Sequence, residues 1–179
     1  LGIIKEASEL ESLALQSDST GGVFLVPAFT GLGSPWWDPT ARGTLIGITR
    51  GTGPSEIARA AIESMVFQTR DVVESMRRAT GGSIRSLKVD GGASVMNSML
   101  QLQAKHLQVN VSRPTSHETT ALGAAYLAGL GHGFWKSMDE INSLWSVEFT
   151  AHPEDLTEID EFAYQQWLLA VRRSLEWVI

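Results

Sequence analysis

The stretch LKVDGGASVMNSML, residues 87–100, places an apolar run, an acidic residue and two glycines directly ahead of a helix-like pattern. The pattern predicts a strand over residues 84–89 and a helix over residues 95–107. Two adjacent glycines at such a junction permit either positive φ angles or the close approach of another molecule to the backbone. Free N–H groups of a helix beginning near Ser94 would face the same space. A purine with its ribose and phosphates suits such a ledge, so a nucleotide site and a purely structural turn are both open.

Two common phosphate-binding motifs are absent from the chain. The glycine pair fits neither GxGxxG nor GxxxxGK[ST], and the second glycine-rich stretch, GTGPS at residues 51–55, lacks the lysine of a phosphate loop. Turn glycines followed by a proline and Ser55 are instead typical of a helix start with Ser55 as N-cap.

Strands and helices alternate along the rest of the chain. Beyond the two elements above, the pattern predicts helices over 3–16, 55–79, 119–130 and 156–178 and strands over 23–26, 44–49 and 109–112. Residues 27–43 lack periodicity and form a predicted loop. This alternation indicates an α/β domain with a partly parallel sheet, and no linker divides residues 1–179 into separate domains.

Composition narrows the class of protein. The 179 residues include no cysteine and carry a net charge of −6, with 43% hydrophobic residues. The negative charge disfavours nucleic acid and anionic membranes as partners, and no apolar run is long enough to span a bilayer. The absence of cysteine excludes a disulfide scaffold and fits a cytoplasmic protein. The chain begins in mid-pattern without a methionine, so we expect a piece of a longer protein.

Other candidate groups are weaker. His106, His117, His132 and His152 show no metal-binding spacing, and no Ser-His-Asp arrangement can be assembled from the sequence. His117 and Glu118, just before a predicted helix, could orient a ligand or cap that helix.

Two apolar groups allow structural and functional interpretations. Trp36 and Trp37 lie in the predicted loop, where they could form a stacking platform or a plug beneath the loop. The small or apolar residues of helix 119–130 predict close packing against a sheet or another helix; they are Gly123, Ala124, Leu127 and Ala128.

A longer pattern resembles a known family. GTLIGITRGTGPSEIARAAIES, residues 43–64, is similar to the second signature of the FGGY carbohydrate kinases, over about twenty residues. VDGGA at residues 89–93 and RPTSHETTALGAAYLAGLGHGFW at residues 113–135 follow the same family in order and spacing. The loop PAFTGLGSPWWDPTARG, residues 27–43, resembles the form found in the glycerol kinases of that family.

The resemblance implies an α/β fold of the actin-like ATPase, ribonuclease-H-like type, in which a mixed sheet is flanked by helices. This chain would be most of the C-terminal lobe, with the first strands of the lobe and the whole N-terminal lobe absent. Family members transfer the γ-phosphate of ATP, bound with Mg²⁺, to a sugar or polyol. The complete protein would phosphorylate glycerol to glycerol 3-phosphate, and we expect it to be a cytoplasmic homo-oligomer.

The resemblance also implies that the adenosine side of ATP contacts the glycine turn. The expected residues are Gly91, Gly92, Ala93, Met96 and Asn97. Met96 stands where glycerol kinases commonly have an asparagine, and a thioether cannot replace the hydrogen bonds of an amide.

No catalytic residue and no metal ligand are assigned to this chain. The resemblance implies that the general base is an aspartate of the absent lobe, which also supplies most glycerol contacts. Two alternatives remain at this point: another FGGY sugar or polyol kinase, and a non-catalytic lobe that binds nucleotides or other proteins.

Overall fold

The computed structural model describes residues 2–116 and 118–177. In chain order the elements are α1 (Glu9–Ala14), β1 (Phe24–Val26), β2 (Thr44–Ile46), α2 (Pro54–Thr80), β3 (Ser86–Lys88), the 3₁₀ helix η1 (Gly92–Val95), α3 (Asn97–Leu107), β4 (Asn110–Pro114), α4 (Thr119–His132), α5 (Met138–Ser143), β5 (Val147–Ala151) and α6 (Glu158–Ser174).

The strands form two small sheets. β1 and β2 pair antiparallel, with Phe24 opposite Ile46. β3, β4 and β5 form a mixed sheet in that order, in which β3 and β4 are parallel and β4 and β5 are antiparallel. The predicted mixed sheet with a parallel pair is confirmed. β5 was not predicted, because its short alternating segment follows a polar-aromatic stretch that lacks clear strand boundaries.

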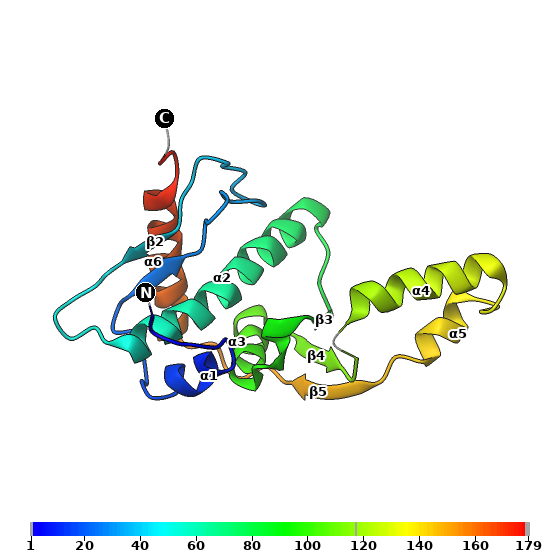
Figure 1. The fold of residues 1–179 in the computed structure, drawn as a ribbon. Coiled ribbons are helices and arrows are strands. Elements are labelled where there is room, and N and C mark those ends of the chain that lie inside the picture. The colour runs from blue at the N-terminus through cyan, green and yellow to red at the C-terminus, as the bar shows by residue number, and fades with distance from the viewer. Residues whose placement is uncertain (1, 117, 178–179) are drawn as a thin grey trace.

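Helix α2 lies between α6 with the β1–β2 sheet and α3 with the mixed sheet (Figure 1), and it contributes to an apolar core on each side. On one side its residues Ala58, Ile62 and Val66 pack with α3 and with the mixed sheet. On the other side Phe67 packs with β1, loop 27–43 and α6. Burying two faces of one long helix joins both cores into a single packed unit.

Two predicted helix starts were wrong. Helix α1 begins at Glu9 rather than at residue 3, and Gly2, with a φ of 70°, lies in a conformation that a helix does not use. Helix α2 is capped by Gly53 rather than Ser55. Glu56 accepts a hydrogen bond from the Gly53 N–H at 2.8 Å, and Pro54 occupies the first helical position.

Helices α4 and α5 project from one side of the molecule (Figure 1), and we call them the arm. None of the α4 residues is buried; Leu127 is 65% exposed, and a Cβ added at Gly123 would meet no atom within 4 Å. The predicted close packing of α4 was therefore wrong for the described residues. Apolar composition predicts burial, but the burying partner has to be present.

Among residues 2–116 and 118–177, no helix has the length and apolar character needed to cross a membrane.

Candidate functional site

The glycine turn, residues 90–93, directly follows β3 and its extension. Val89 N–H donates to the Ser112 carbonyl at 3.0 Å, which carries the parallel pairing of β3 and β4 up to the turn. The carboxyl ends of parallel strands share one edge of the sheet, and ligands of open α/β sheets bind outside that edge. The turn therefore occupies the position at which this type of sheet binds ligands.

The two glycines of the turn differ in backbone conformation and surroundings. Gly91 has a φ of 83°, a conformation that residues with a side chain rarely adopt. Gly92 has no such φ, and a Cβ added there would meet no atom within 4 Å. The structural interpretation thus accounts for Gly91 alone. Neither backbone conformation nor packing within the described chain requires glycine at position 92, which leaves room for a molecule outside it.

The turn also presents hydrogen-bond donors. Ser94 N–H donates to the Gly91 carbonyl and Met96 N–H to the Ala93 carbonyl. The N–H groups of Gly92 and Ala93 have no acceptor among the described residues. Gly92 and Ala93 are exposed, so both donors can reach a ligand placed over the turn.

The helix that follows differs from the predicted one. Residues 92–95 form the 3₁₀ helix η1, Met96 is extended, and α3 begins only at Asn97. The side chain of Glu11 from α1 accepts hydrogen bonds from the Ser98 N–H at 2.8 Å and the Ser98 hydroxyl at 2.6 Å. One N–H of the α3 start is therefore satisfied within the protein and is not available to a ligand.

The structure separates the remaining candidate residues. Met96 is only 7% exposed, and its side chain packs in the core beneath the turn. Its thioether is apolar and flexible, which explains its burial. Asn97 is exposed, and its Oδ1 accepts a hydrogen bond from Nη1 of Arg113 at 3.1 Å. The side chain of Asn97 thus lies on the surface, whereas that of Met96 does not.

The turn is connected to the arm. Thr119, the first residue of α4, donates its hydroxyl hydrogen to the Asp90 carboxylate. Glu118 occupies the N-cap position of α4, but its side chain caps no N–H, so the capping interpretation of Glu118 was wrong. His117 lies outside the described residues.

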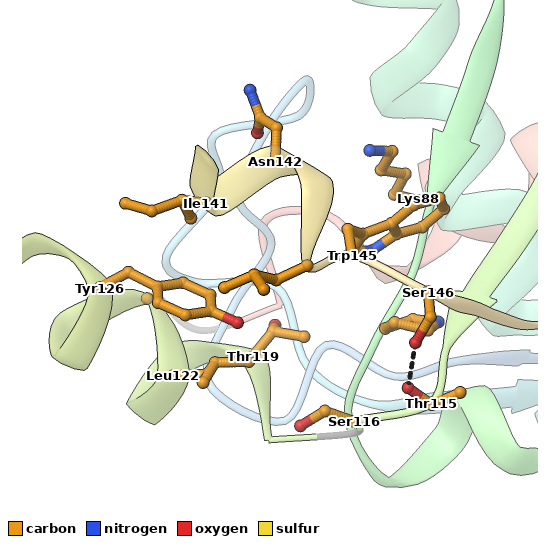
Figure 2. A pocket seen from close by; sticks show the side chains of 13 residues that line it. Lys88, Thr115, Ser116, Thr119, Leu122, Tyr126, Ile141, Asn142, Trp145 and Ser146 are labelled. Carbon is orange, nitrogen blue, oxygen red and sulfur yellow. Dashed lines mark hydrogen bonds between the residues drawn. The ribbon is translucent and has the colours of Figure 1, made fainter. Parts of the chain in front are cut away.

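A hollow of about 260 Å³ lies between the sheet edge and the arm (Figure 2). Trp145 and Tyr126 contribute aromatic surface to it, and Nζ of Lys88 lies 3.8 Å from the centre of the Trp145 ring. The hydroxyls of Thr115 and Ser146, which lie 2.7 Å apart, contribute polar groups. These residues were not predicted, because only the fold brings β3, α4 and the segment before β5 together.

The two tryptophans of loop 27–43 have different environments. Trp36 is half-buried, and its Nε1 donates to Oδ2 of Asp71 at 3.0 Å, so the plug interpretation holds for Trp36. Trp37 is 74% exposed and has a φ of 51°. The platform interpretation remains open for Trp37 alone.

Among the described residues, no group of three or more His, Cys, Asp or Glu side chains could hold a metal ion. His106 is 6% exposed, and burial lowers its pKa to about 4, so it is neutral at pH 7.

Comparisons with known proteins place the chain in a class. The family described as the FGGY family of carbohydrate kinases, C-terminal domain, matches residues 3–132. The chain therefore belongs to the FGGY carbohydrate kinases. Its fold is that of their C-terminal lobe, an actin-like, ribonuclease-H-like α/β fold.

Individual relatives narrow the comparison to one kind of kinase. The chain is 52% identical to glycerol kinase 2 of Thermotoga maritima and 51% identical to the glycerol kinase of Oleidesulfovibrio alaskensis, over 99% of its own length in both cases. It spans 36% of the length of each.

Solved structures of related kinases share the fold of this chain. The crystal structure of Plasmodium falciparum glycerol kinase with ADP matches 97% of the chain and 35% of the other protein, with a TM-score of 0.82 and 31% identity. A xylulose kinase from Lactobacillus acidophilus matches with a TM-score of 0.72 at 20% identity over 97% of the chain and 34% of the kinase, which shows the fold alone.

Proposed function

We propose that this chain is the C-terminal part of an ATP-dependent glycerol kinase, which forms glycerol 3-phosphate. We call a protein of the relatives' length that contains this chain the full-length protein. The observation that carries the proposal is 51–52% identity to curated glycerol kinases along 99% of the chain. The general base and most contacts to glycerol belong to the part of the full-length protein outside residues 1–179.

In this proposal the glycine turn binds the adenosine side of ATP. Gly91 shapes the turn, Gly92 leaves the space above it open, and the N–H groups of Gly92 and Ala93 are available as donors. Asn97 lies beside them at the surface, and Met96 supports the turn from the core. The nucleotide supplies the phosphoryl group, and its Mg²⁺ would be held by residues outside this chain.

We also propose that residues 1–179 act as one domain of a cytoplasmic homo-oligomer. The shared helix α2 between the two cores supports a single domain.

An acceptor assay tests the proposed function. The full-length protein is incubated with Mg-ATP and with glycerol, xylulose or gluconate, and ADP release is measured. Glycerol should give a kcat/KM at least a hundredfold above that of the other two acceptors. A preference for xylulose or gluconate would assign the chain to another FGGY kinase, and no activity with any acceptor would favour a non-catalytic lobe.

A further inference from the structure

Arg113 is a buried cation directly beneath the glycine turn. It lies on β4 and is only 6% exposed. Its Nη1 donates to the Ser94 carbonyl at 2.6 Å and to Oδ1 of Asn97 at 3.1 Å, and its Nε donates to Glu148 at 2.9 Å. One guanidinium thus holds both the 3₁₀ helix after the turn and the side chain of Asn97.

This contact determines which way the Asn97 amide faces. A guanidinium carries donors and no acceptor, so the amide atom next to Arg113 has to be the oxygen. The amide nitrogen, Nδ2, therefore points away from Arg113. Nδ2 has no hydrogen-bond partner among the described residues, and Asn97 is exposed beside the turn.

The burial of Arg113 is costly in free energy. Removing a guanidinium from water costs several kcal/mol, and a well-packed apolar residue is often as stable as a buried ion pair. Glu148, whose side chain is 44% exposed, neutralises the charge at the protein surface. The benefit of an arginine at this position therefore lies in the geometry that its several donors impose.

We propose that Arg113 is a positioning residue for nucleotide binding, which fixes the Asn97 amide so that Nδ2 donates to an acceptor atom of the nucleotide. The inference rests on the proposed function of the turn. Two parts of a nucleoside carry suitable acceptors: the ring nitrogens of adenine and the hydroxyl oxygens of ribose. With Nδ2 fixed in this way, Asn97 favours a nucleotide that presents an acceptor atom to it and disfavours one that presents a donor.

A double-mutant cycle in the full-length protein tests this role. The dissociation constant of ADP is measured by calorimetry for Arg113→Lys, Asn97→Ala and the double variant. A lysine lacks the planar guanidinium and its fixed donor directions, so it holds the Asn97 amide less rigidly, and each single variant should weaken ADP binding about tenfold. The double variant should be no weaker than Asn97→Ala, because Arg113 acts through Asn97. Additive losses would overturn the inference.

Asn97→Asp provides a test that does not depend on Arg113→Lys folding. The aspartate keeps an oxygen for Arg113 but loses the Nδ2 donor. We expect about tenfold weaker ADP binding and a higher KM for ATP. The thermal midpoint should not fall, because a carboxylate beside Arg113 and at the first position of α3 is favourable. A purely structural role would lower the thermal midpoint instead, and an unchanged dissociation constant would overturn the inference.

Nucleotide analogues identify the acceptor. In the wild-type protein, the analogue that lacks the contacted atom should bind about tenfold more weakly than ADP. In Asn97→Asp, this analogue and ADP should bind equally well. The probes are the 1-deaza, 3-deaza and 7-deaza forms of ADP for the base and its 2′-deoxy and 3′-deoxy forms for the ribose. If no analogue has a smaller affinity difference from ADP in Asn97→Asp than in the wild-type protein, the inference fails.

Failure of the inference can be distinguished from failure of the proposed function. If Gly92→Val weakens ADP binding but Asn97→Asp does not, the turn remains the nucleotide site and only the role of Asn97 and Arg113 is lost. If neither variant weakens binding, the turn itself is not the site.

Discussion

Gly92 distinguishes a ligand-binding turn from a merely structural one. Its φ is acceptable for any residue, and the space around its Cβ position is open. We predict that Gly92→Val leaves the fold intact but raises the dissociation constant of ADP at least tenfold, because the branched side chain fills the space above the turn. Calorimetric titration of the full-length protein measures the change.

Gly33→Val is the matched control for this variant. Gly33 also has an ordinary φ and no atom within 4 Å of its Cβ position, but it lies in loop 27–43. The Gly33→Val substitution should leave the affinity for ADP unchanged. Equal ADP affinities of the Gly92→Val and wild-type proteins would show that the turn does not bind the nucleotide.

His106 makes stability depend on pH. Burial lowers its pKa from 6.5 to about 4, and Arg70 Nη1 lies 3.4 Å from its Nδ1. The other charged groups near it are Lys105, Asp160 and Glu161. Because the unfolded chain takes up this proton at a higher pH than the folded chain, the stabilisation is complete above pH 6.5 and is lost toward pH 4.

Proton linkage predicts that the contribution of His106 to the free energy of unfolding falls by about 2 kcal/mol between pH 7.5 and pH 5. Urea unfolding at both pH values measures this change. The free energy of unfolding should fall less in His106→Gln than in the wild-type chain, since the other groups titrate alike in the two proteins. Identical losses would contradict a buried, neutral His106.

At the scale of elements, Asp71 joins three parts of the chain. Its carboxylate is 3% exposed and accepts hydrogen bonds from Trp36 of loop 27–43 and from Tyr164 and Trp167 of α6, at 2.6–3.0 Å. Both carboxylate oxygens of Asp71 accept hydrogen bonds, so in Asp71→Asn the amide NH₂ group would face at least one N–H or O–H donor. We predict a loss of about 2–4 kcal/mol in the free energy of unfolding, measured with urea.

Asp155→Asn is the control for this prediction, because it removes the same charge from an exposed residue. Its effect should stay within about 0.5 kcal/mol. If both variants are equally stable, the Asp71 hydrogen bonds do not hold the loop to α6.

The elements show how far local sequence signals reach. The order strand, glycine turn and helix around residues 87–100 was predicted, because a strand pattern and a glycine pair are local signals. The C-terminal end of α2 was also predicted, because Gly81, which caps the helix in the left-handed conformation, directly follows it. Arg113 was missed as a supporting residue, because a single arginine in a short strand carries no sign of its burial. The packing of α4 was predicted wrongly, because it depends on a partner that composition does not specify.

At the scale of the whole molecule, the chain exposes apolar surface. Among the described residues β3 has no strand on its second edge, and α4 has no buried residue. Open strand edges and apolar patches promote association. We predict that the isolated chain self-associates at micromolar concentration, as measured by sedimentation velocity.

Substitutions on two helices locate the associating surface. Leu127→Glu on α4 should shift the isolated chain toward monomer, whereas Ile159→Glu, at an 80% exposed position on α6, should not. A clean monomer of the wild-type chain with a sharp unfolding transition would contradict the prediction.

In the proposal made above, the full-length protein is a glycerol kinase whose adenosine site is the glycine turn. A crystal structure of the full-length protein with ADP and glycerol tests it most directly. We predict that the ribose or adenine contacts Gly92 and Ala93 and that glycerol is bound mainly by residues outside this chain. A nucleotide bound away from residues 91–97 would contradict it.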